Sequence, residues 1–327
     1  MKITLLTESE LRQCVGLDQD ALAVIAAAFA ALSADRVQQP PILRIDVPEH
    51  HGEVDVKSAY LAGEEGFAVK ISSGFFDNDK LGLPSASGMM IVLDARSGVP
   101  AALLLDNGYL TDLRTGLAGA VAARHLAPAT PGTIGIIGTG AQARTQLRAL
   151  ALVRDVSRVL VYGRTPDKVR RYVAEMNGLF PTVEAAGLPA LVKQSQLVVT
   201  TTPAQQPFLE AAWLHPGLHI TAMGSDAEHK QELTPEVLRR ADLLVCDSKE
   251  QCFRLGELRG GLEAGAISRD TAVVELGEVV SGRRAGRRTT QEITVCDLTG
   301  TGVQDTAIAL LALKRARALG LGTEIEA

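Results

Sequence analysis

A glycine-rich turn is the first feature of this sequence with the spacing needed for chemistry. It reads Gly138-Thr-Gly140-Ala-Gln-Ala143, follows a short apolar run and precedes a segment of helical pattern. In a GxGxxA turn the first glycine permits a tight bend, the second lets the backbone approach a pyrophosphate, and the small last residue keeps the helix close to the sheet. Unpaired N–H groups at the helix N-terminus favour an anion. The pattern predicts a dinucleotide site formed by Gly138, Thr139, Gly140, Ala141, Gln142 and Ala143.

The strand predicted after this turn ends without the usual acid. Where an Asp or Glu normally holds the ribose 2′-hydroxyl of NAD, the chain reads Gly163-Arg164-Thr165. Arg164 and Thr165 are suited to a 2′-phosphate, which favours NADP or the use of both cofactors. In the alternative interpretation, Arg164 only stacks on the adenine. The predicted cofactor is therefore NAD(H) or NADP(H).

Three cations in the N-terminal part of the chain occupy positions where an unpaired charge is costly. Arg44 and Lys70 fall in the middle of alternating, half-buried segments. Arg114 lies near the start of a predicted helix, where the helix dipole prefers acids. Together they are suited to a carboxylate, which arginine can grip through two parallel hydrogen bonds. For Arg44 or Lys70 taken singly, a solvated sheet face is the competing interpretation.

One carboxylate is placed where chemistry is expected. Asp226 follows a predicted strand at 219–223 and the loop Gly224-Ser225. Ligands of open α/β sheets bind beyond the carboxyl ends of the strands. A carboxylate there can act as general acid or base toward a substrate amine, whereas the structural alternative is a turn or cap residue.

The elements that must position these residues fall into two parts. Short alternating runs without intervening helices predict an antiparallel or mixed sheet in the first part, with strands at 42–47, 54–61, 67–72, 89–93 and 101–105. Helices are predicted from about residue 18, over 111–126 and over 303–319.

In the second part, strands alternate with helical segments. This rhythm predicts a parallel sheet covered on both faces, with strands at 133–137, 158–162, 197–201, 219–223, 243–246 and 293–296. The predicted fold class is α/β: a Rossmann-type doubly wound domain over 121–302, and a smaller α+β substrate-binding domain over 1–120 that is completed by a C-terminal helix within 303–327.

Composition excludes several classes of protein. The chain has 327 residues, which favours two domains, and 46% of them are hydrophobic, so a disordered chain is excluded. A net charge of −5 without a basic tail argues against a nucleic-acid partner. The sequence contains no run of about 18 apolar residues, so no membrane span is predicted. The four cysteines have no metal-site spacing, so no metal is predicted, and free thiols are typical of a cytoplasmic protein.

Taken together, these segments resemble the ornithine cyclodeaminase/mu-crystallin family over nearly the whole chain. The similarity is carried by the segments Pro40–Arg44, Ala68–Ile71, Leu110–Thr115, Ile137–Ala143, Gly224–Glu232 and Gly300–Asp305. The resemblance implies NAD(P)-dependent chemistry, a two-fold homodimer formed by the smaller domain, substrate-carboxylate binding by Arg44, Lys70 and Arg114, and catalysis by Asp226 and Lys70. It also implies that Thr201, Thr202, Gly302 and Val303 line the cofactor.

One departure from the family pattern bears on the substrate. Cyclodeaminases of this family place Pro-Gly between the catalytic Asp and the following Lys, whereas this chain reads Asp226-Ala-Glu228-His229-Lys230. The segments 52–57 and 74–84 instead look like a branch containing ectoine-utilisation proteins and iminosuccinate reductases.

Three functions follow from the resemblance. The first is an NAD(P)H-dependent imine reductase or amino acid dehydrogenase, with iminosuccinate to aspartate as the sharpest expectation and Lys57 suited to a second carboxylate. The second is a redox-neutral cyclodeaminase of ornithine or diaminobutyrate, with Glu53 or Asp55 holding the distal ammonium. The third is a non-catalytic NADP-binding protein of the crystallin type.

Overall fold

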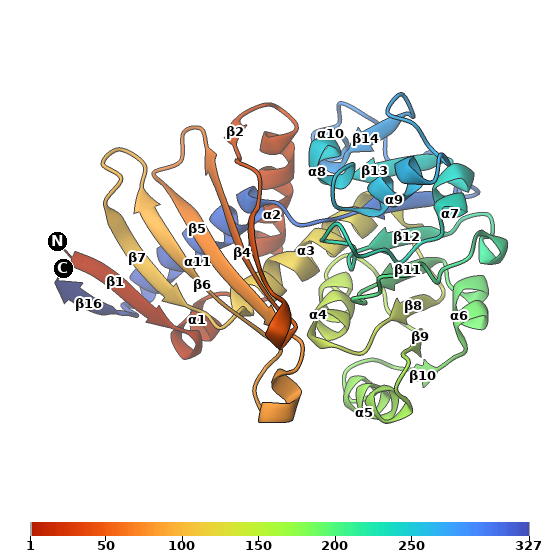
Figure 1. Ribbon diagram of the computed structural model, residues 1–327, viewed down its shortest axis with the longest axis horizontal. Helices are drawn as coiled ribbons and strands as arrows, with labels where there is room; N and C mark the ends of the chain where they lie inside the picture. Colours follow the sequence, from red (N-terminus) through yellow and green to blue (C-terminus); the bar gives the residue numbers. More distant parts are fainter. Residues whose placement is uncertain (1, 327) are drawn as a thin grey trace. The chain divides into compact units, whose positions relative to one another are not determined.

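The computed structural model describes residues 2–326, and the contacts within it divide the chain into two compact units (Figure 1). Unit 1 contains the residues up to Arg114 together with those from Thr301 onward, and unit 2 contains Thr115–Gly300. The sequence-based boundaries lay at 120/121 and 302/303. Substrate binding by the first part and dinucleotide binding by the second stay predictions.

Unit 1 is built on one mixed sheet with the strand order β16-β1-β7-β6-β5-β4-β2, to which β3 adds by pairing with β4. Only the β1–β7 pair is parallel among the registered pairs of this sheet. The strands are β1 (Lys2–Thr7), β2 (Val37–Gln38), β3 (Leu43–Val47), β4 (Gly52–Leu61), β5 (Gly66–Phe75), β6 (Ala86–Asp94), β7 (Pro100–Leu105) and β16 (Thr323–Glu326).

Helices cover one face of this sheet, as Figure 1 shows for α2 (Gln19–Leu32) and the long α11 (Gly302–Leu319). Helix α11 packs on β4, β5 and α2, while α1 (Glu8–Cys14) lies against α11 and β1. Side chains alternate along the strands, so Ala68 and Met90 are buried under the helices. On the opposite face, Leu43, Ile45 and Met89 are exposed.

Unit 2 is a parallel sheet with the order β10-β9-β8-β11-β12-β15-β13-β14. Its strands are β8 (Ile134–Ile137), β9 (Val159–Tyr162), β10 (Val183–Ala185), β11 (Leu197–Thr200), β12 (His219–Ala222), β13 (Leu243–Cys246), β14 (Val273–Glu275) and β15 (Thr294–Asp297). The helices are α3 (Tyr109–Leu126, which begins in unit 1), α4 (Ala141–Leu150), α5 (Pro166–Met176), α6 (Leu188–Gln194), α7 (Pro235–Arg240), α8 (Lys249–Cys252), α9 (Glu257–Glu263) and α10 (Leu276–Val280). A short 3₁₀ turn lies at Ala211–Trp213, and unit 1 has two more, at Pro48–His50 and Asn78–Leu81.

Both faces of the parallel sheet are buried by helices. One apolar cluster joins Leu147 of α4 to Ile136 and Val199, and the other joins Leu191 of α6 to Val198 and Ile220. Neighbouring residues of β11 therefore contribute to different cores, as expected for a strand covered on both sides. The predicted fold class, a doubly wound parallel sheet plus a smaller α+β part, is confirmed.

Short or terminal strands account for most of the differences from the sequence-based prediction. The predicted strands all correspond to observed ones within a few residues, but β1, β2, β10, β14 and β16 were not predicted. Helix α3 begins at Tyr109, two residues before the predicted start at 111. Among the described residues, no single helix is long and apolar enough to cross a membrane, and only α1 and α2 taken as a bent pair meet that criterion.

Asp297 at the end of β15 generates a prediction about stability. Its side chain is buried, Oδ2 accepts a hydrogen bond from the Leu258 backbone N–H at 3.0 Å, and Oδ1 has no hydrogen-bond partner. Burial, reinforced by the nearby Asp247, raises the pKa of Asp297 to about 7. Because the folded state holds this proton up to a higher pH than the unfolded state, this group's contribution to stability falls as pH rises from about 4 to about 7.

We expect the Asp297→Asn variant not to lose stability through this group as pH rises, because asparagine does not titrate. Thermal denaturation should show that the Tm of the variant minus the Tm of the native chain increases between about pH 5 and about pH 8. A Tm difference that is constant with pH would show that Asp297 does not titrate in this range.

Candidate active site

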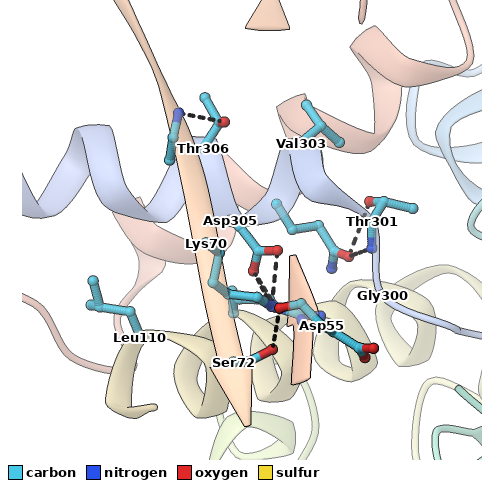
Figure 2. A network of polar contacts seen from close by, with 12 residues as sticks. Asp55, Lys70, Ser72, Leu110, Gly300, Thr301, Val303, Asp305 and Thr306 are labelled. Carbon is cyan, nitrogen blue, oxygen red and sulfur yellow. Dashed lines mark hydrogen bonds and ion pairs between the residues drawn. The ribbon is translucent and has the colours of Figure 1, made fainter. Parts of the chain in front are cut away.

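A buried cluster of charges lies between the sheet and the helices of unit 1. Lys57, Lys70 and Arg114 are each less than a tenth exposed, and Asp305 is fully buried. The Nζ atom of Lys70 lies 3.0 Å from both carboxylate oxygens of Asp305 (Figure 2). Arg114 Nε lies 2.9 Å from Asp305 Oδ1. One carboxylate therefore holds two cations inside the unit.

Strand register and helix position explain how these residues meet. Lys57 of β4 and Lys70 of β5 are direct cross-strand partners, so their side chains leave the same face of the sheet. Arg114 comes from α3, in the second turn rather than at the predicted helix start. Asp305 lies in the first turn of α11, where the helix dipole favours a negative charge.

Burial and neighbouring charges set the ionisation of this cluster. Burial and the neighbouring Arg114 lower the pKa of Lys70 to about 7. Burial opposes ionisation of Asp305, but Arg114 and Lys70 outweigh it and hold the pKa of Asp305 below its usual value. The other nearby acid, Asp106, is buried, and that burial raises its pKa. Three buried cations thus gather around one carboxylate that favours its ionised form, an arrangement suited to an anionic ligand.

Arg44 has different partners from those expected. Its guanidinium pairs closely with Glu53, lies 2.9 Å from Asp46 Oδ1 and lies 3.7 Å from Asp55 Oδ1. The strand register places Arg44, Asp55 and Lys57 on the same face of the sheet, but Arg44 is already matched by carboxylates. The structure thus brings Lys70 and Arg114 together with Lys57 around Asp305, whereas the contacts of Arg44 are with Glu53, Asp46 and Asp55. Binding of a substrate carboxylate by Arg44 stays a prediction.

The glycine turn of unit 2 has the geometry of a phosphate cradle. Gly138 has φ +124°, and a Cβ there would lie 2.3 Å from Thr201 Oγ1. Gly140 precedes α4 as its N-cap, and a Cβ at Gly140 would meet no atom within 4 Å. Ala143 is fully buried against the sheet. The open space at Gly140, at the N-terminus of α4, fits a pyrophosphate, because the first turn of a helix favours an anion.

The predicted 2′-phosphate residues lie beside this turn. The backbone N–H of Gly138 donates to Tyr162 O at the end of β9, and a Cβ at Gly163 would lie 2.9 Å from the Thr139 side chain. Arg164 and Thr165 follow directly and are exposed. The position at which an acid normally binds the ribose is therefore occupied by an exposed cation.

Asp226 lies in the loop after β12 and is paired. Its Oδ1 accepts a hydrogen bond from Lys230 Nζ at 2.8 Å, and Lys230 is nearly buried while the Asp226 side chain is 44% exposed. Thr202, also in unit 2, donates from both its N–H and its hydroxyl to Glu232 Oε1, each at 2.7 Å. The structure thus gives the predicted acid a cation partner and leaves its side chain partly exposed.

Two residues assigned to the cofactor lie in the core of unit 1. Gly302 approaches β4 so closely that a Cβ would lie 2.5 Å from Ser58 O. Val303 is fully buried with Ala28 and Ala59, and its N–H donates to Gln39 Oε1 at 3.2 Å. These contacts give Gly302 and Val303 a packing role, and their assignment to the cofactor stays a prediction.

Two buried acids had no role assigned from the sequence. Asp305 is separated from Lys70 by 235 residues, and Glu232 is separated from Thr200 and Thr202 by 32 and 30. The sequence contained Asp305 only as the last residue of the family-like segment Gly300–Asp305, and its partners are visible only in the fold. Within the described residues, no group of three or more His, Cys, Asp and Glu side chains is arranged to hold a metal ion.

Comparison with known proteins gives consistent results. The model of the ornithine cyclodeaminase/mu-crystallin family matches residues 1–319. An uncharacterized cyclodeaminase of Sinorhizobium fredii is 53% identical, over 100% of this chain and 99% of that relative. The Δ1-pyrroline-2-carboxylate reductase of Thermococcus litoralis, solved with NADH and L-proline, has a TM-score of 0.93 at 30% identity, covering 99% of this chain and 100% of that one. The iminosuccinate reductase of Paracoccus denitrificans, solved with NAD⁺, has a TM-score of 0.90 at 29% identity, covering 100% of both chains.

The two glycines of the turn lead to opposite expectations for alanine substitutions. Gly140→Ala adds a methyl group in open space, so Tm should stay within about 1 °C. The affinity for NADH or NADPH should fall at least about tenfold, because the methyl group occupies the space that a pyrophosphate needs. Gly138→Ala places a Cβ against Thr201 at positive φ and should lower Tm. Nucleotide fluorescence titration and thermal denaturation measure both effects. Unchanged nucleotide binding in folded Gly140→Ala would refute this cofactor site.

Proposed function

Because the chain belongs to the ornithine cyclodeaminase/mu-crystallin family, we propose that it uses NAD(P)H to reduce the C=N bond of an imine that carries a carboxylate. The observation that carries the proposal is the gathering of the buried cations Lys57, Lys70 and Arg114 around Asp305. A buried cluster of cations is suited to an anionic substrate. Solved relatives that contain NADH or NAD⁺ and act on imines support the same reaction class.

The residues divide the work of such a reaction. Arg114 and Lys70 bind the substrate carboxylate, which fixes the orientation of the C=N bond and lowers the entropic cost of the reaction. Asp226 holds or delivers the proton at the imine nitrogen, with Lys230 fixing one of its oxygens. The bound nicotinamide supplies the hydride that the imine carbon receives. The product is then the amine of an amino acid, and the reverse reaction is amino acid oxidation.

The cofactor is held by the GxGxxA turn, with Gly140 and the start of α4 at the pyrophosphate. Exposed Arg164 and Thr165 support the use of NADPH as well as NADH, because a cation at this position can pair with a 2′-phosphate. Thr201 is tied to the turn through its hydrogen bonds to Ile137 O, so it is suited to line the same site.

Iminosuccinate, which is reduced to aspartate, is the substrate we favour. Lys57 adds a third cation to the cluster and is the cross-strand partner of Lys70, which suits a second carboxylate. An iminosuccinate reductase is also among the similar structures. A cyclic imine with one carboxylate is the nearest competitor, because a pyrroline-2-carboxylate reductase has an equally similar fold.

The redox-neutral cyclodeaminase is the second candidate, and the name of the 53% identical relative favours it. Such an enzyme needs a carboxylate for the distal ammonium of its substrate. Glu53 and Asp55, the two acids considered for this role, both lie within ion-pair distance of Arg44. Their engagement favours the reductase.

A homodimer is the assembly we propose. The face of the unit 1 sheet that lies opposite α2 and α11 exposes Leu43, Ile45 and Met89. Burial of such apolar side chains by a second copy would remove them from water. One of the similar structures, from an archaeal alanine dehydrogenase, is described as a dimer with bound NAD.

The stoichiometry of cofactor oxidation separates the three functions. The purified chain is given NADH or NADPH with ammonia and oxaloacetate, glyoxylate or pyruvate, and separately ornithine or diaminobutyrate with NAD⁺. A reductase oxidises the reduced cofactor in proportion to amino acid formed, with oxaloacetate as the preferred partner. Ammonia release from a diamino acid without net cofactor change would replace the reductase with the cyclodeaminase. Nucleotide binding without any turnover would favour the crystallin-type protein.

The titration of Lys70 predicts how activity depends on pH. Because Lys70 must be protonated to bind a carboxylate and its pKa in the free protein is lowered to about 7, kcat/KM should fall as pH rises above about 7. Asp305 works to raise the pKa of Lys70, so Asp305→Asn should move this fall to lower pH. The measurement is kcat/KM across pH for both proteins. Lys70→Met serves as the control, since it should lose activity and this pH-dependent fall together.

A further inference from the structure

The loop that carries Asp226 closes on itself. It connects β12 to α7 without regular secondary structure. Ser225 Oγ donates to Lys230 O at 2.7 Å, Lys230 N donates to Ala227 O at 3.0 Å, and Lys230 Nζ donates to Asp226 Oδ1 at 2.8 Å. These bonds fix the shape of the loop, but they do not attach it to the sheet.

Glu232 joins both ends of the loop to the end of β11, beside single hydrogen bonds from Gln231 N–H to Ala204 O and from Arg259 to Lys230 O. Its carboxylate is fully buried, and Oε1 accepts the two hydrogen bonds from Thr202. Oε2 accepts a hydrogen bond from the Gly224 N–H at 2.8 Å and another from the Thr200 hydroxyl. One side chain at the end of the loop thus binds the start of the loop and the end of β11. Gly224 must approach closely, since a Cβ there would lie 2.2 Å from Thr202 O.

A second buried carboxylate fixes Glu232 itself. Glu257, in the first turn of α9, is fully buried. Its Oε1 accepts the Glu232 N–H at 2.8 Å and its Oε2 accepts the Leu233 N–H at 3.0 Å. The Glu232 carbonyl accepts hydrogen bonds from the N–H groups of Phe208 and Leu209. Backbone and side chain of Glu232 are therefore held independently, so the carboxylate is a fixed reference point.

We propose that Glu232 is the positioning residue that keeps Asp226 and Thr202 in a fixed relation, so that the proton at the substrate nitrogen is transferred from a fixed point. The inference rests on the proposed function for the role of Asp226. It assigns Glu232 no contact with substrate or cofactor. Its effect passes through the loop that carries Asp226 and through the end of β11.

Glu232→Gln tests the proposal with little change of shape. Glutamine retains one oxygen, so its NH₂ group must face either the Thr202 N–H or the Gly224 N–H, whichever way the amide turns. We expect kcat to fall by about 10- to 100-fold with substrate KM changed less than about threefold, because binding by the unit 1 cluster is untouched. In a chain that already carries Asp226→Asn, Glu232→Gln should change kcat by less than about twofold, because the two residues act through one path.

Glu292→Gln is the matched control. Glu292 is also a buried acid that anchors a loop of unit 2, where it accepts the backbone N–H groups of Arg288 and Thr289. It has no hydrogen bond to the Asp226 loop among those described, so kcat should stay within about twofold in both backgrounds. The proposal is overturned if Glu232→Gln lowers kcat by the same factor in the native chain and in the Asp226→Asn chain. It is also overturned if Glu292→Gln lowers kcat as much as Glu232→Gln does.

Hydrogen exchange keeps the test separate from the proposed function. If no imine or amino acid is turned over, the proposed function fails, but the loop can still be measured. Amides 224–230 should exchange faster in Glu232→Gln than in the native chain, while amides 288–293 should not. Unchanged exchange over 224–230 would overturn the positioning role whatever the reaction proves to be.

Discussion

The buried carboxylate of Asp305 is the interaction on which unit 1 depends. It neutralises part of the charge of Lys70 and Arg114, and it joins α11, near the end of the chain, to a strand and a helix formed much earlier. Loss of one partner from a buried ion pair typically costs about 3–5 kcal/mol, because a charge is left without compensation. The same carboxylate leaves enough positive charge for a ligand, so the fold and the proposed binding of an anion depend on one group.

Local patterns made the dinucleotide turn predictable. Gly138, Gly140 and Ala143 are close in sequence, and their requirements come from backbone geometry that a single turn defines. The alternation of strands and helices likewise predicted the parallel sheet. Strands β1 and β16 lie near the two ends of the chain and pair with each other, and β1 also pairs with β7, so each forms by pairing with a distant segment. Propensity within either segment carries little of that information.

The charged residues show where sequence reasoning stopped. Residue type and position marked Lys70 and Arg114 as unusual, but the same reasoning grouped them with Arg44, which the fold supplies with Glu53 and Asp46. Whether a cation is available depends on its partners across the sheet, and these depend on register. Glu232 was noted only as part of a motif, because its role requires knowing that the loop after β12 returns to the end of β11.

The division of the chain sets the order in which its parts can be completed during synthesis. Unit 2 is contiguous, so every residue of its core is synthesised before α11 begins. Lys57, Lys70 and Arg114 are synthesised long before Asp305, and they must remain in water until that carboxylate arrives. Since domains generally fold as units during synthesis, the N-terminal sheet should close last. The unit with the proposed substrate cluster is thus finished after the unit with the proposed nucleotide turn, and a chain truncated before α11 would lack the carboxylate that pairs with Lys70 and Arg114.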